Sequence, residues 1–130
     1  MKLIDEAKPE LVFLSNSDSY VIELDGDSLK VDEDRLASGV TQVVERLEAQ
    51  QVDFVIIRDT PMLEFEPLNC LSKAAWKGTD PSSGCTFNID DSTNESVYGI
   101  IGSIVAGAQK GFLVDMNQEI CPGRKGCSLE

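Results

Sequence analysis

The ten residues "VDFVIIRDTP", residues 52–61, decide the fold class of this chain. They form an almost unbroken apolar run that ends at Pro61, and proline cannot donate a hydrogen bond to a neighbouring strand. A continuous apolar run of this length is typical of a strand buried on both faces, as in a parallel sheet. The stretch therefore predicts a buried strand over residues 52–61 that is stopped by Pro61.

Two further apolar runs predict two more strands. "LVFLSN", residues 11–16, ends in a polar pair, and "GFLVDM", residues 111–116, carries Asp115 near its end. Between them, "YVIEL" at residues 20–24 is interpreted as a short extension or edge strand. The chain is therefore expected to contain three main strands, each with polar residues at its carboxyl end.

Amphipathic helices are predicted at residues 33–50 and 92–109, between the strands. Asp32 can cap the first helix, and the acidic residues that follow it complement the helix dipole. Apolar residues at helical spacing define one face of each helix. They are Leu36, Val40, Val43, Val44 and Leu47 in the first helix, and Val97, Ile100, Ile101, Ile104, Val105 and Ala108 in the second.

Two segments are predicted to lack regular structure. The acidic stretch "DGDSLKVDEDR", residues 25–35, lacks the alternating ligand spacing of an EF-hand and is interpreted as a solvated loop and a helix start. The segment 62–86 is rich in Pro, Gly and Ser. A connection of that length without helix or strand is usually functional or held by cross-links.

The order strand, helix, strand, loop, helix, strand predicts an α/β fold with a parallel sheet covered by helices. Three strands make a thin sheet, so residues 1–130 are expected to form a single α/β domain or the later part of one. Sites in such sheets form at the carboxyl ends of the strands. Here these ends are Ser15–Asn16, residues 58–61 and Asp115.

Composition excludes several classes of function. The formal net charge of −12 disfavours nucleic acid and anionic membrane surfaces as partners. The chain has no histidine, so it lacks the imidazole base of a serine or cysteine hydrolase and any histidine ligand for zinc. No apolar run is long enough to cross a bilayer, and the first ten residues do not resemble a secretory signal.

Four cysteines, at positions 70, 85, 121 and 127, allow two disulfides in three connectivities. Local pairing would join Cys70 to Cys85 and Cys121 to Cys127, closing two loops rich in turn residues. The short cysteine spacings of an all-cysteine zinc site are absent. We therefore expect two disulfides, disulfide-closed loops 70–85 and 121–127, and an oxidising compartment.

An ordered set of segments resembles a known family. "KPELVFLSNS", "FVIIRDTPMLEFEPLNCL" and "FLVDMNQEICPGRKGC" together resemble the SGNH-type extracytoplasmic domain found in acyltransferase-3 family membrane O-acyltransferases. The resemblance extends from about Lys8 to Cys127. It implies a flavodoxin-like three-layer α/β/α fold, an incomplete sheet in this chain, and no cofactor.

The resemblance also implies a function and partners. The family acylates or deacylates cell-envelope carbohydrates, so the expected partners are a membrane acyltransferase domain of the same polypeptide and a carbohydrate or cell-envelope acyl acceptor, with no nucleic acid. The expected location is extracytoplasmic, either periplasmic or at the cell surface, with a membrane-anchored parent protein. Only the oxyanion-hole asparagine of the family finds a counterpart here, Asn16.

The family's Gly-Asp-Ser and Asp-x-x-His blocks have no counterpart in residues 1–130, so the chain by itself is expected to be inactive. Two alternatives stay open. The chain can be a non-catalytic secreted domain that binds glycans or another partner. Alternatively, "GDSL" at residues 26–29 marks a GDSL esterase with Ser28 as the nucleophile, although no helix is predicted directly after this serine. A cytosolic flavodoxin-like or receiver-type domain is a weaker third alternative, because it leaves the cysteine loops unexplained.

Overall fold

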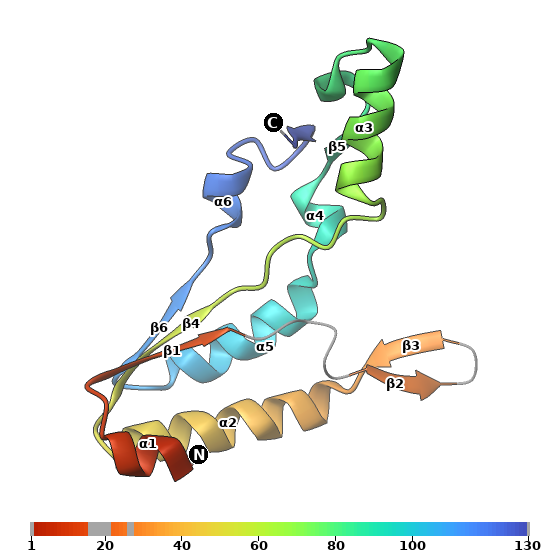
Figure 1. Ribbon diagram of the computed structural model, residues 1–130. Helices are drawn as coiled ribbons and strands as arrows, with labels where there is room; N and C mark the ends of the chain where they lie inside the picture. The colour runs from red at the N-terminus through yellow and green to blue at the C-terminus, as the bar shows by residue number, and fades with distance from the viewer. Residues whose placement is uncertain (1, 16–21, 26–27, 130) are drawn as a thin grey trace. The chain divides into compact units, whose positions relative to one another are not determined.

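The computed structural model describes residues 2–15, 22–25 and 28–129. The chain divides into two compact units. The first comprises Met1–Asp59 and Glu95–Val114, and the second comprises Thr60–Asn94 and Asp115–Glu130. Figure 1 gives the order of the elements along the chain.

The first unit contains a three-stranded parallel sheet. Its strands are β1 (Leu11–Ser15), β4 (Asp53–Ile57) and β6 (Gly111–Val114), in the order β1-β4-β6. The predicted α/β fold with a parallel sheet is thus confirmed. β4 ends at Ile57, four residues before Pro61. The observed strand is therefore shorter than the predicted strand over residues 52–61.

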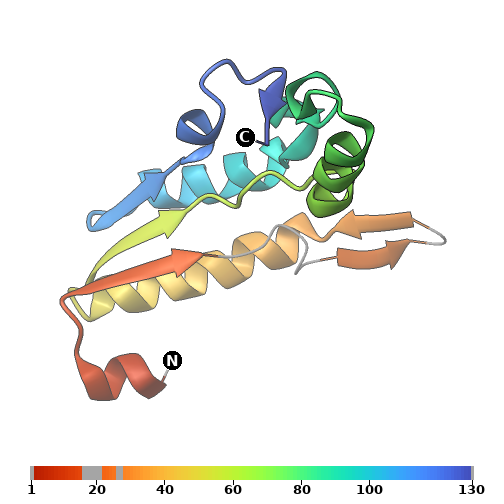
Figure 2. The same cartoon turned by 45° about the horizontal axis from the view of Figure 1, so that its top comes forward.

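Two helices run side by side along one face of this sheet (Figures 1 and 2). They are α2 (Glu33–Ala49) and α5 (Glu95–Ala106), and both lie within the helices predicted from periodicity. The side chain of Asp32 caps α2 by accepting a hydrogen bond from the backbone N–H of Arg35 at 2.9 Å, as predicted. The buried core comprises Leu36, Val40, Val44, Leu47, Val52, Phe54, Ile56, Val97, Ile101 and Val105.

Phe54 lies at the centre of this core and is completely buried. Its ring occupies the space beside Gly111 of the neighbouring strand, where a Cβ atom would lie only 2.4 Å from Cζ of the ring. A residue without a side chain is therefore required at the start of β6 so that the phenylalanine can fill the core.

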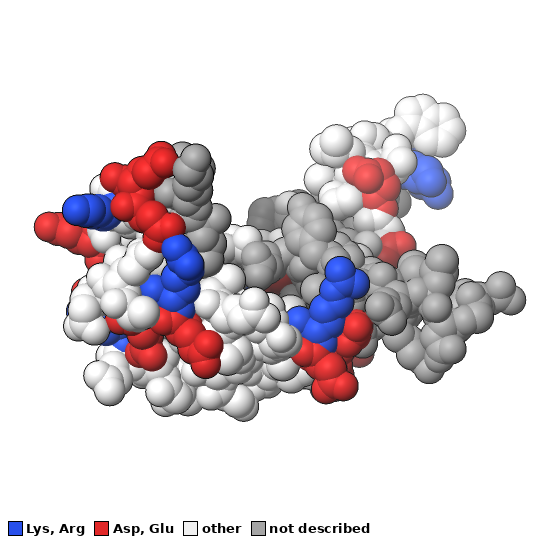
Figure 3. All heavy atoms as spheres, turned by 90° about the horizontal axis from the view of Figure 1, so that it is seen from below, with Lys and Arg blue, Asp and Glu red and all other residues white. Residues whose placement is uncertain are grey.

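Helix α1 (Lys2–Ala7) is attached to the end of α2. Asp5 forms an ion pair with Arg46 at 2.5 Å and also accepts a hydrogen bond from Gln50. The hydrogen bond from Arg46 holds the pKa of Asp5 below its usual value, and the bond from Gln50 adds to this effect. Figure 3 shows isolated basic side chains with acidic neighbours on the face seen from below.

The acidic stretch before α2 is not simply a loop. β2 (Ile22–Asp25) and β3 (Ser28–Val31) pair as an antiparallel hairpin, with Asp25 opposite Ser28. The short strand predicted at residues 20–24 is therefore present in its described part, since residues 20 and 21 lie outside the described residues, whereas the prediction of a loop over residues 28–31 is wrong. Pairing with β2 satisfies backbone groups that a solvated loop would leave to water.

The second unit contains short elements cross-linked by disulfides. It begins with α3 (Pro67–Lys77) and a turn of 3₁₀-helix (Pro81–Ser83), so the prediction that residues 62–86 lack regular structure is wrong. Pro67 at the first helical position and Gly78 in the left-handed conformation after the last turn are typical signals of helix ends. The remaining elements are β5 (Thr86–Phe87), α4 (Ile89–Ser92), α6 (Asn117–Ile120) and β7 (Cys127–Ser128).

Candidate functional site

The candidate site is the carboxyl-terminal edge of the parallel sheet. Ser15, Ile57 and Val114, the last residues of the three strands, stand in one register row. The residues that follow the strands therefore leave the sheet at a common edge, which is where open α/β sheets place their ligands. Asn16, the predicted oxyanion donor, follows Ser15 directly but lies outside the described residues.

Arg58 is the first residue after the central strand, and it is buried. Its backbone N–H donates to the carbonyl oxygen of Val114 at 2.9 Å, which extends the sheet ladder by one residue. Its guanidinium lies over the ring of Tyr98, 4.1 Å from the centroid, and Nη2 donates to Oε1 of Glu95 at 2.7 Å. The sequence placed Arg58 at the strand end but did not indicate either of these partners.

This cluster fixes the start of α5 against the end of β4. Glu95 is the first residue of the helix, where its carboxylate also complements the helix dipole, and Tyr98 lies one turn later. A buried guanidinium is costly unless it is paired and hydrogen-bonded, and the Glu95 carboxylate and the Tyr98 ring supply that compensation. Arg58 therefore has a structural role at this edge.

A small cavity adjoins Arg58 and Tyr98, and Leu113 contributes to its wall. Its volume is about 10 Å³, which is room for a single water molecule at most. It is too small for an acyl group or a sugar.

Asp115, the third predicted strand-end residue, takes part in a turn. Its carboxylate accepts a hydrogen bond from the backbone N–H of Asn117 at 2.9 Å, just where α6 begins. Asn117 is itself buried. This hydrogen bond gives Asp115 a local structural role within the second unit, where it orders the chain that leads to the final cysteine loop.

Ser28 is the first residue of β3, and three more strand residues follow it. α2 begins only at Glu33. In a nucleophile elbow the serine stands between a strand and the N-terminus of a helix, which polarises the site. Strand residues therefore follow Ser28 along the chain, whereas the motif requires a helix directly after the serine.

Two disulfides define the second unit: Cys70–Cys85, with a Cα–Cα distance of 5.9 Å, and Cys121–Cys127, with 5.4 Å. The predicted local pairing is therefore confirmed. Disulfides persist in oxidising compartments, so this pair of bridges indicates an extracytoplasmic environment. Among the described residues, no helix is both long and apolar enough to span a bilayer.

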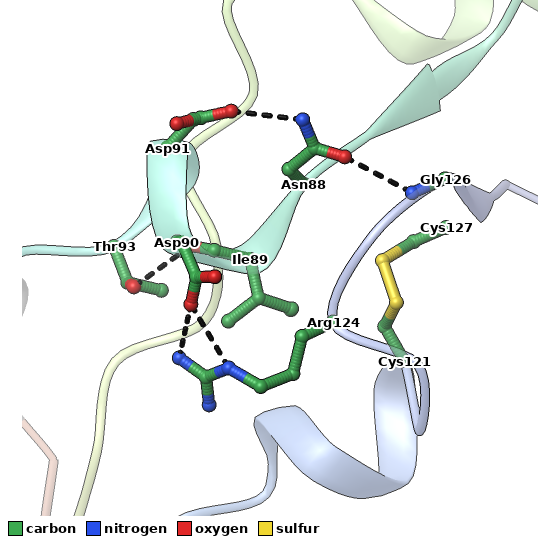
Figure 4. The surroundings of a disulfide bond; sticks show 9 residues. All are labelled: Asn88, Ile89, Asp90, Asp91, Thr93, Cys121, Arg124, Gly126 and Cys127. Atoms are coloured by element: carbon green, nitrogen blue, oxygen red, sulfur yellow. Dashed lines mark hydrogen bonds and ion pairs between the residues drawn. A yellow bond between two sulfur atoms is a disulfide. The ribbon is translucent and has the colours of Figure 1, made fainter.

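The final cysteine loop is held by residues 88–91 (Figure 4). The side chain of Asn88 accepts a hydrogen bond from the backbone N–H of Gly126 at 3.0 Å, and the N–H of Ile89 donates to the carbonyl oxygen of Arg124 at 2.9 Å. Asp90 forms an ion pair with Arg124. Ile89 is completely buried against the second disulfide. No local sequence pattern indicates this long-range contact, because its two sides are more than thirty residues apart.

The described residues bring together no group of three or more cysteine or acidic side chains that could hold a metal ion. A scan against protein-family models, a search of curated proteins and a search of solved structures each gave no match. The fold and the site therefore define a small α/β domain with a three-stranded parallel sheet and two disulfides, without identifying its family.

Proposed function

We propose that the chain is part of an SGNH-type O-acyltransferase or esterase domain that acts on acyl esters of cell-envelope carbohydrates outside the cytoplasm. The observation that carries the proposal is the position of the two disulfides in the sequence. Each closes a segment that follows a strand of the parallel sheet, after β4 and after β6. These are the same segments that carry the resemblance to the family.

Asn16 is the residue that would contribute directly to the chemistry. In acyl transfer a serine oxygen attacks the ester carbonyl, and negative charge develops on the carbonyl oxygen. An asparagine side-chain amide held at a strand end can donate a hydrogen bond to that oxygen. The nucleophile and the imidazole base would come from a different segment of the parent protein, because this chain contains no histidine.

A covalent label on the native protein tests this function. A fluorophosphonate reacts with an activated serine, and peptide mass spectrometry then identifies the labelled residue. We expect label on a serine outside residues 1–130 and none on the isolated chain. Label on Ser28 would instead establish this residue as a nucleophile. Absence of any label on the active native preparation would contradict the acyl-transfer function.

The oxyanion role of Asn16 has its own test in the native, full-length protein. Asn16→Ala should lower kcat for ester hydrolysis by roughly 10²–10³, the usual cost of removing one oxyanion donor. Asn69→Ala is the matched control, because this asparagine is exposed in α3 and does not directly follow a strand of the parallel sheet. Equal kcat values for the Asn16 variant and the control would show that Asn16 does not take part in the reaction.

A non-catalytic glycan-binding domain is the second candidate. The absence of histidine favours it, because glycan binding needs no imidazole base. It predicts carbohydrate binding by a native protein that does not react with the fluorophosphonate. The labelling experiment therefore separates the two candidates.

A further inference from the structure

The second face of the parallel sheet carries a row of exposed aromatic side chains. Phe13 of β1 pairs with Val55 of β4, which pairs with Phe112 of β6, so the three side chains stand in one row across the sheet. Phe13 and Phe112 are each 64 % exposed. Leu11, Ile57 and Val114 lie on the same side, and so do Ser15 and Asp53 at the margins. Together these residues form what we call the open sheet face.

Helices α2 and α5 do not reach this face. They pack on the opposite side, where Phe54, Ile56 and Leu113 point into the core. The strand order β1-β4-β6 advances in one direction, and parallel crossovers share one hand, so both connecting helices fall on the same face. Parallel sheets almost always have both faces covered, because an exposed apolar face of this kind is unfavourable in water.

Size and charge argue against a second copy of the chain as the cover. Three strands of at most five residues present a face of about 14 Å by 16 Å. A face of that size is much smaller than the area of about 800 Å² that each partner buries in a stable pair of globular chains. Two chains that each carry a net charge of −12 also repel one another.

An α-helix fits both the size and the charge. A helix is about 10–12 Å wide, and about eleven residues of it span 16 Å. We propose that the open sheet face binds an amphipathic α-helix from outside residues 1–130, with its apolar stripe on the Phe13–Val55–Phe112 row and lysines or arginines on its flanks. The apolar stripe supplies the contact, and the basic flanks complement the acidic chain. This inference does not depend on the proposed acyl-transfer function.

A synthetic helical peptide tests the proposal. The probe has leucines at i, i+3, i+4 and i+7 and lysines on its flanks, and two comparison peptides carry glutamates on the flanks or the same residues in scrambled order. Binding is measured by calorimetry with the whole chain. We expect the lysine-flanked helix to bind the wild-type chain more tightly than either comparison peptide.

Variants of the chain locate the binding surface. Phe13→Ser and Phe112→Ser should each weaken peptide binding about tenfold, because each removes a largely exposed ring that the helix would bury. Leu68→Ser is the matched control, since Leu68 is equally exposed but belongs to α3 of the second unit. Binding that is absent, or that the control variant loses instead, would overturn the proposal.

Two further measurements distinguish the proposed helix from other occupants of the open sheet face. If analytical ultracentrifugation shows a dimer that Phe13→Ser abolishes, a second copy of the chain covers the face, and the proposal of a helix is wrong. Urea unfolding gives the remaining comparison. If Phe13→Ser lowers stability as much as truncation of buried Phe54, the chain itself already covers the face, and the proposal is wrong. Unchanged stability of the Phe13 variant supports the proposal.

Discussion

Replacement of Gly111 by alanine should destabilise the first unit, although alanine is usually well tolerated. The backbone of Gly111 is not in the left-handed region, so a methyl group would cause no conformational strain. The obstacle is the ring of Phe54, whose Cζ and Cε2 atoms would lie 2.4 and 2.7 Å from the added Cβ. The ring is completely buried and can move away only by displacing its core neighbours.

The expected cost is about 1–3 kcal/mol, the usual penalty for adding a group to a packed core. Gly39→Ala is the matched control, because nothing lies within 4 Å of the Cβ position of this exposed residue in α2. The same chemical change should there stabilise the protein by about 0.5–1 kcal/mol, the difference between glycine and alanine in a helix. The two variants should therefore change stability in opposite directions.

Urea unfolding followed by far-ultraviolet circular dichroism measures both effects. Trp76 is 86 % exposed, so its fluorescence would report poorly on the core. The midpoint should fall for Gly111→Ala and rise slightly for Gly39→Ala, with unchanged m-values. If Gly111→Ala is as stable as the wild type, Phe54 does not pack against β6, and the reasoning about this core is refuted.

Three other predictions concern the ion pairs and the disulfides. Glu95→Gln should lower the urea midpoint by the equivalent of about 1–3 kcal/mol, because it removes the ion pair that the Glu95 carboxylate makes with buried Arg58; an unchanged midpoint would show that this pair does not stabilise the fold. Joint replacement of Cys70 and Cys85 by serine should cost about 3 kcal/mol through lost loop closure, which thermal unfolding would detect against the wild type. The lowered pKa of Asp5 stabilises the folded state above the ordinary value of 3.8, and this contribution is lost as the pH falls through the folded pKa. Asp5→Asn should therefore be less stable than the wild type at neutral pH, and the difference should shrink as the pH falls below 3.8; a difference that stays constant as the pH falls through this range would contradict the assignment.

The parallel strands of the first unit and the two helices that cover them could be predicted because their patterns are local. Apolar spacing located α2 and α5, and the continuous run around Phe54 located β4. The local disulfide pairing was also accessible, since each bridge closes a short segment. By contrast, β3 and α3 were missed, because acidic residues and a Pro- and Ser-rich composition concealed a hairpin strand and a helix.

Only the location of the candidate site, at the carboxyl ends of the strands, could be predicted from the sequence. Topology places sites at the strand ends, so the sequence could identify Arg58 and Asp115 as residues of that edge. It could not indicate that Arg58 is buried against Glu95 and Tyr98, because the residues of that ion pair lie 37 positions apart. Asn16 remains a prediction, since it lies outside the described residues.

By itself, the sequence determined the fold class, the strand order along the chain and the cysteine pairing. These depend on hydrophobic periodicity and on short loop closures, which are properties of neighbouring residues. Only the tertiary structure decided which face of each strand is covered and which charged side chains meet. Phe54 and Phe112 are both apolar residues of adjacent strands, yet one is fully buried and the other mostly exposed. The physical reason is that both crossover helices fall on the same side of the sheet, and this depends on strand order in space rather than on any single residue.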